Sequence, residues 1–190
     1  MSPPAPPPPI VYRVDAADVI VEIGEGFGDF AAANGAPGLE RTVVGTSLWS
    51  HVEGFEVRSI YRDLLATCRG SHGALEFPYR CDSPARRRFM RMRMAGVGAG
   101  SVAFESELLR EEPRAPVELP APAPRPGDDL LILCAWCRQA DVGRWVELEE
   151  AIRRLDLFGP RPPPTITHGI CPTCERSVRT ESGLRWQRGA

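Results

Sequence analysis

Apolar and polar residues in the first half of the chain fall into short runs with two different periods. The run VYRVDAADVIVEIG predicts two short strands around a turn at residues 16–18, and FGDFAAANG predicts a short helix. In SLWSHVEGFEVRSIYRDLLATCRG, apolar residues recur at helical spacing at Val57, Ile60, Leu64 and Leu65. This spacing predicts a longer helix with one apolar side.

Three strand-like runs follow this helix: ALEFPYRC, RRFMRMRMAGV and GSVAFESELLRE. In the middle run, Met90, Met92 and Met94 alternate with Arg91 and Arg93. Because successive side chains of a strand point to opposite faces, the methionines are predicted to face the core and the arginines the solvent.

The last of these runs also has two different faces. Val102, Phe104, Ser106 and Leu108 form the more apolar set and are assigned to the inside. The opposite faces of the last two strands carry mostly charged residues, and cross-strand pairs between them are worth roughly 0.2 to 1 kcal/mol each. A mixed surface of this kind suits a weak homodimer contact. The residues of this predicted dimer face are Phe89, Arg91, Arg93, Glu105 and Glu107.

Near the C-terminus, two C-x-x-C pairs are separated by residues 138–170. Two such loops can close a tetrahedral site around Zn²⁺, with four sulfur ligands about 2.3 Å from the ion. The predicted ligands are Cys134, Cys137, Cys171 and Cys174.

The interval between the two cysteine pairs predicts structure of its own. GRWVELEEAIRRLDLFG places Trp145, Leu148, Ile152 and Leu155 on one face of a predicted helix, and LLIL before the first pair predicts a strand. A segment this short has a small core, so zinc binding is expected to supply much of its folding free energy.

Proline-rich stretches divide the chain into parts. Residues 1–9 are predicted to be a disordered tail, and residues 113–127 a semi-rigid linker. The linker separates a first block, residues 10–112, from a metal-binding block, residues 128–180, and residues 181–190 form a tail. The two blocks are expected to fold separately.

The formal net charge is -2, and all 23 basic residues are arginines. This balance argues against general binding to phosphate backbones. No apolar run approaches the roughly 20 residues that span a bilayer, and the N-terminus has no secretory signal, so we expect no membrane association and a cytoplasmic location. Cysteines are reduced there, which favours metal or redox chemistry over disulfides.

The first block resembles a PAS domain in the order of its elements: two strands, short helices, one longer helix and three strands. VVGTSLWSHVEG and FPYRCDSPARRRFMRMRMAGV resemble segments of this superfamily. The resemblance implies an α+β fold with a five-stranded antiparallel sheet and helices on one face. That face holds either a small-ligand pocket or a filled core. The residues predicted to surround this pocket or core are Trp49, Phe55, Met90, Met92 and Met94.

The second block resembles a small zinc module, with one helix, found behind many bacterial PAS and response-regulator domains. LCAWCRQADVGRWVELEEAI followed by ITHGICPTCER carries the resemblance, with Arg138 and Thr167 departing from the usual lysine and serine. The resemblance implies no enzyme activity.

The cysteines and histidines of the chain also allow other roles than zinc binding and core packing. Redox dithiols are an alternative interpretation of the cysteine pairs, although no βαβ unit surrounds them. His168 is an alternative metal ligand, and Cys68 and Cys81 are alternative flavin or redox sites. His51 and His72 are alternative haem ligands, but neither flavin nor haem is the expected cofactor.

Two functions are therefore considered. The first is a non-enzymatic bacterial sensory protein that binds a small ligand or a protein partner, including a second copy of itself. The second is a nucleic-acid binder of the zinc-ribbon type, which would use Arg138, Arg144, Arg153, Arg154 and Arg176.

Overall fold

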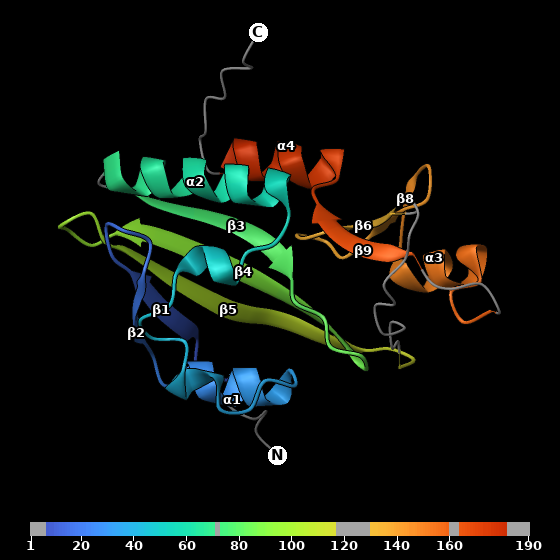
Figure 1. Ribbon diagram of the computed structural model, residues 1–190, viewed down its shortest axis with the longest axis horizontal. Helices are drawn as coiled ribbons and strands as arrows, with labels where there is room; N and C mark the ends of the chain where they lie inside the picture. Colours follow the sequence, from blue (N-terminus) through green and yellow to red (C-terminus); the bar gives the residue numbers. More distant parts are fainter. Residues whose placement is uncertain (1–6, 71–72, 117–129, 160–163, 182–190) are drawn as a thin grey trace, which may run out of the picture.

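The computed structural model describes residues 7–70, 73–116, 130–159 and 164–181. Its main feature is a five-stranded antiparallel sheet with the order β2-β1-β5-β4-β3 (Figure 1). The strands are β1 (Ile10–Val14), β2 (Ile20–Ile23), β3 (Ala74–Arg80), β4 (Arg86–Gly96) and β5 (Val102–Pro113). The prediction of a mixed α and β fold with such a sheet is confirmed.

Two helices and two short 3-10 turns connect β2 to β3. They are α1 (Gly26–Ala33), η1 (Leu39–Arg41), η2 (Leu48–Ser50) and α2 (Phe55–Gly70). The long helix α2 buries Val57, Ile60, Leu64 and Leu65, the apolar side predicted from their spacing. In Figure 1, α2 runs along the β3 side of the sheet and α1 lies near β1 and β2.

The inner face of the sheet is apolar, as the alternation predicts. Met90, Met92 and Met94 are each at most 5% exposed, and Val102 and Phe104 of β5 are fully buried beside them. The predicted inward direction of these residues is confirmed. The sheet and α2 therefore enclose one apolar interior.

The outer face carries ion pairs between neighbouring strands. Arg91 pairs with Glu107 at 2.5 Å, and Arg93 lies 3.7 Å from Glu105. Phe89 lies opposite Arg110 at an irregularity in the β4–β5 register, and the Arg110 guanidinium covers its ring at 3.9 Å from the ring centre. The predicted cross-strand pairs are present, while dimerisation through this face stays a prediction.

The C-terminal part forms a second, smaller sheet with the order β8-β7-β6-β9. Its strands are β6 (Leu130–Cys134), β7 (Ala140–Asp141), β8 (Trp145–Val146) and β9 (Thr165–Gly169), and its helices are α3 (Leu148–Leu155) and α4 (Pro172–Glu181). β6 and β9 are parallel neighbours, while the other pairs are antiparallel. A small apolar cluster between this sheet and α3 includes Leu131, Leu133, Leu148 and Ala151.

The predicted helix of this part needs correction at both ends. Trp145 lies in β8 and not on the helix, because α3 begins only at Leu148. Leu155, in the last turn, is 43% exposed, and Ala151 takes its place among the buried residues. β9 and α4 are elements that the sequence pattern did not predict.

The two sheets share one hydrophobic core, which differs from the expected separation into two independently packed blocks. Trp136 is 3% exposed and packs against Tyr61 of α2 and Phe77 of β3, with ring centres 5.9 and 6.3 Å away. The backbone N–H of Arg80 donates to the carbonyl of Trp136 at 2.5 Å. The same cluster includes Val178 of α4.

Ion pairs reinforce this junction. The Arg80 guanidinium bonds Asp82 in the connection between β3 and β4, and Glu147 before α3, the latter at 3.0 Å. Arg87 reaches Glu149 of α3 at 2.8 Å. Because the Arg80 and Asp82 side chains are mostly buried, losing one of them would leave the other without its partner.

The predicted tails and linker lie largely outside the described residues. This holds for most of the predicted tail at residues 1–9, for residues 117–127 of the predicted linker and for residues 182–190 of the C-terminal tail. The start of the predicted linker is corrected, since β5 continues to Pro113 and pairs there with Arg86. Pro113 lies beyond the part of β5 that pairs with β1, which ends at Ser106, so β5 is there an edge strand, where proline is tolerated.

None of the helices within the described ranges is both long enough and apolar enough to pass through a bilayer.

We predict that Trp136→Ala destabilises both sheets together, by about 3 to 5 kcal/mol, since it empties a site in the shared core. Hydrogen exchange should then speed up in β3 and α2 as well as in β6 and β9. The control is Phe55→Ala, which removes an aromatic side chain that is 84% exposed and should change stability by under about 0.5 kcal/mol. Faster exchange confined to β6 and β9 would contradict a shared core.

Candidate metal centre and adjoining cavity

The four predicted cysteines lie at two adjacent strand ends. Cys134 is the last residue of β6 and Cys137 lies in the turn that follows it. Cys171 follows β9, and Cys174 lies in the first turn of α4. Since β6 and β9 are parallel, both strands deliver their cysteines to the same end of the sheet.

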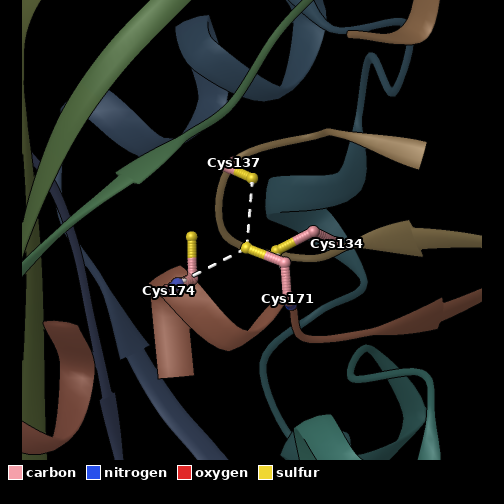
Figure 2. A group of neighbouring side chains, drawn as sticks. All are labelled: Cys134, Cys137, Cys171 and Cys174. Atoms are coloured by element: carbon pink, nitrogen blue, oxygen red, sulfur yellow. Dashed lines mark hydrogen bonds between the residues drawn. The ribbon is translucent and has the colours of Figure 1, made fainter. Parts of the chain in front are cut away.

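The four sulfur atoms form a compact group and lie within 4.8 Å of one another (Figure 2). A tetrahedral ion with metal–sulfur bonds of about 2.3 Å requires sulfur atoms about 3.8 Å apart. The Sγ atoms of Cys137 and Cys171 lie at 3.8 Å. All six cysteines are free thiols. The group therefore fits a tetrahedral metal ion with four sulfur ligands.

The backbone conformation around Cys134 and Cys137 favours metal binding by these cysteines. Arg138 adopts a left-handed conformation with φ of 63°, and its N–H donates to the carbonyl of Cys134 at 2.9 Å. Backbone N–H groups also point at sulfur atoms: that of Cys171 donates to Cys134 Sγ and that of Cys174 to Cys171 Sγ, both at 3.4 Å. Such bonds stabilise thiolates, the form in which cysteine binds metals.

The mutual hydrogen bonds of the thiols also set their protonation. Bonds donated by Cys137 and Cys174 lower the pKa of Cys134 to about 2. The same bonds raise the pKa of Cys137 to about 12 and raise that of Cys174 too, because each thiol must keep its proton to donate. A divalent cation would compensate the charge of further thiolates, so metal binding is expected to release protons.

His168 does not belong to this group of sulfur atoms. Its Nδ1 lies 3.4 Å from Glu53 Oε2, on the loop before α2. Burial, and secondarily the charge of Arg138, lower the pKa of His168. We therefore assign His168 to the contact between the two sheets and not to the metal.

A cavity of about 240 Å³ adjoins the metal centre. It lies between α2, the end of β3, the turn between Cys134 and Cys137, and the end of β9. Its lining residues are His51, Val52, Glu53, Val57, Tyr61, Phe77, Tyr79, Ala135, Trp136 and His168. Ala135 and Trp136 are the two residues between the first pair of cysteines, so the metal loop is itself part of the cavity wall.

The loop at the mouth of the cavity is held by specific contacts. Arg58 of α2 donates to the carbonyls of Val52 and Trp49, at 2.7 and 2.8 Å. Gly54 has a φ of 86°, and a Cβ at this position would collide with the backbone oxygen of His168. Glycine is required here both for its conformation and for the close approach of β9.

The residues predicted to surround a pocket lie elsewhere. Phe55 is 84% exposed, which corrects its predicted inward position: it is the first residue of α2, and its side chain points away from the core. Trp49 is partly buried and donates from Nε1 to Asp18 at 2.9 Å. Met92 and Met94 pack within the core, and Met90 lines a separate hollow beside α1.

The sequence analysis missed most residues of the cavity. Tyr61, Phe77, Tyr79 and Trp136 lie on three separate elements, and only their burial in one place makes them a site. The presence of Trp136 within the C-x-x-C loop is the one signal that points to it, since a large aromatic residue there needs a place to be buried.

A scan against protein-family models found no matching family, and a search of curated proteins found no matching relative.

We predict that the protein binds one zinc ion per chain and that Cys171→Ser abolishes stoichiometric binding, because a serine hydroxyl cannot replace a thiolate ligand here. Elemental analysis of freshly reduced protein measures the metal, and Co²⁺ substitution reports its tetrahedral sulfur coordination. The matched control is Cys81→Ser, a half-buried cysteine outside the group. Equal zinc content in both variants, or none in the native protein, would contradict the assignment.

Proposed function

We propose that this protein is a non-enzymatic sensory protein of the PAS-like type, with a structural zinc centre, that binds a small ligand in the cavity beside the metal loop. One observation carries the proposal: the cavity is lined from both parts of the chain, by Val57 and Tyr61 of α2 on one side and by Trp136 and His168 on the other. A ligand there would contact both parts at once.

A ligand in this position can change how the two parts pack. It would bind best to one arrangement of α2, β3 and the metal loop, and binding would shift the population toward that arrangement. The five-stranded sheet with helices over its inner face supports the PAS-like part of the proposal.

The zinc centre is assigned a structural role because four cysteine ligands complete a tetrahedral coordination. A catalytic zinc keeps a position for water or substrate, which a site with four protein ligands lacks. The metal instead holds the loop that carries Ala135 and Trp136 against the main sheet.

The alternative of a nucleic-acid binder has less support. Arg144 and Arg154, two of the arginines assigned to it, both pair with Glu150, at 2.9 and 2.6 Å. Their charge is therefore partly neutralised. Titration of labelled DNA and RNA at two salt concentrations would reveal such binding by a steep salt dependence.

We predict that native mass spectrometry of the protein purified from its own host detects a bound small molecule together with zinc. Val57→Phe should reduce the small-molecule occupancy because it fills the cavity, at a cost of about 1 to 3 kcal/mol in stability. Zinc content should stay unchanged, which verifies the fold of the variant. Val44→Phe is the control, at a position 48% exposed. No small molecule in the native protein, or equal occupancy in all forms, would argue against the proposal.

We further predict that the output is association with a protein partner or a second copy, through the outer face of the main sheet. A concentration-dependent dimer should weaken in Phe89→Glu, while the fold survives because Arg80 and Arg110, which flank the ring, can pair with the new carboxylate. Sedimentation equilibrium measures the dissociation constant, with Val44→Glu as the control. A monomer at all concentrations, or a dimer equally affected by both changes, would exclude this face.

A further inference from the structure

We propose that the cavity beside the metal loop binds an organic cation whose ammonium nitrogen carries alkyl groups, with the aromatic side chains around the charge and Glu53 at the mouth. This inference rests on the ligand-binding function proposed above and specifies the ligand class. It follows from the side chains that line the cavity, their charge and their capacity for hydrogen bonds.

Four aromatic side chains line this one cavity: Tyr61, Phe77, Tyr79 and Trp136. The Trp136 ring is inclined to Tyr61 by 45° and to Phe77 by 48°, with centres 5.9 and 6.3 Å apart. The rings come from α2, β3 and the metal loop and therefore approach the same space from three directions. Ring faces carry negative electrostatic potential, which attracts a cation placed against them within about 6 Å.

The charge of the lining residues also favours a cationic ligand. Glu53 is the one carboxylate or guanidinium side chain among the residues that line the cavity. Its side chain is 78% exposed, so it lies toward solvent, where it can attract a cation and contact the entering charge. Arg138 lies outside this cavity, in a neighbouring hollow that shares Tyr61, Tyr79 and Ala135, and its charge reaches the cavity only at His168.

The walls favour an alkylated over a bare ammonium group. Val52, Val57 and Ala135 add apolar surface to the lining, and the imidazole side chains of His51 and His168 complete it. A primary ammonium would have to direct all three of its N–H donors at the scattered polar atoms of the lining, which are the tyrosine hydroxyls, the two imidazoles and Glu53. Any donor left unpaired costs free energy. A quaternary ammonium has no N–H groups, and its methyl groups pack against apolar and aromatic surface. The volume of about 240 Å³ is sufficient for a head group of this size.

The test compares two probes of nearly equal shape. Choline carries a quaternary nitrogen, and 3,3-dimethylbutan-1-ol replaces that nitrogen by carbon and is neutral. Isothermal titration of the zinc-loaded full chain, dialysed to remove small molecules, should show choline binding about ten-fold more tightly than the alcohol. The preference should decline with added salt, because Glu53 is exposed.

Two variants locate the binding. Glu53→Gln should weaken choline binding about two- to five-fold and leave that of the alcohol unchanged, as expected for an exposed ion pair. Glu76→Gln is the matched control, since it removes the same charge from the outer face of the sheet. Tyr61→Leu should reduce the choline preference further, with zinc content and melting temperature measured to verify the fold.

The results separate this inference from the proposed function. Equal binding of both probes, or tighter binding of the alcohol, would overturn the cation specificity while leaving a functional apolar cavity. Binding of neither probe would also overturn it, and the proposed function would then be judged by native mass spectrometry of the host protein. Choline binding that is equally weakened by Glu53→Gln and Glu76→Gln would place the cation elsewhere.

Discussion

The indole of Trp136 is buried between α2, β3 and the metal loop, and both parts of the chain depend on this contact. Trp136 stands between two cysteines, so its backbone is positioned by the sulfur atoms on either side. Its carbonyl accepts from Arg80, which connects the metal loop to the outer strand of the main sheet. This bond satisfies one backbone donor at the end of β3, whose other side is an edge of the sheet.

The C-terminal part has a small core of its own, between α3 and the four-stranded sheet. Segments of this size rarely fold on an apolar core alone. Two additional sources of stability meet at the same place: the four cysteines, which fit a metal ion, and the apolar surface of the main sheet. Metal binding and docking are therefore expected to stabilise each other, since each fixes the position of the loop that the other requires.

The cavity arises at the boundary between these two packed regions. The interior under the main sheet is filled by side chains such as Met94 and Phe104, which are fully buried. The junction is formed instead by large inclined rings and by the loop before α2, which Arg58 anchors and in which Gly54 permits the close approach of His168. These inclined rings leave a cavity between them, and a ligand bound there would contact both parts of the chain.

The sequence by itself determined the local features. Alternation in β4 and helical spacing in α2 predicted which side chains are buried. Each period gathers the apolar residues on one face of the element, and that face packs against the core while the other faces solvent. The spacing of the cysteines predicted their assembly, since two cysteines separated by two residues can both reach one ion. Only the tertiary structure decided the exposure of Phe55, the parallel pairing of β6 with β9, and α4, whose cysteine-containing start has no clear apolar period. It also decided the shared core and the cavity. Residues 52–61, 77–79, 135–136 and 168 are far apart in the chain, and their meeting depends on how whole elements pack, which no local period encodes.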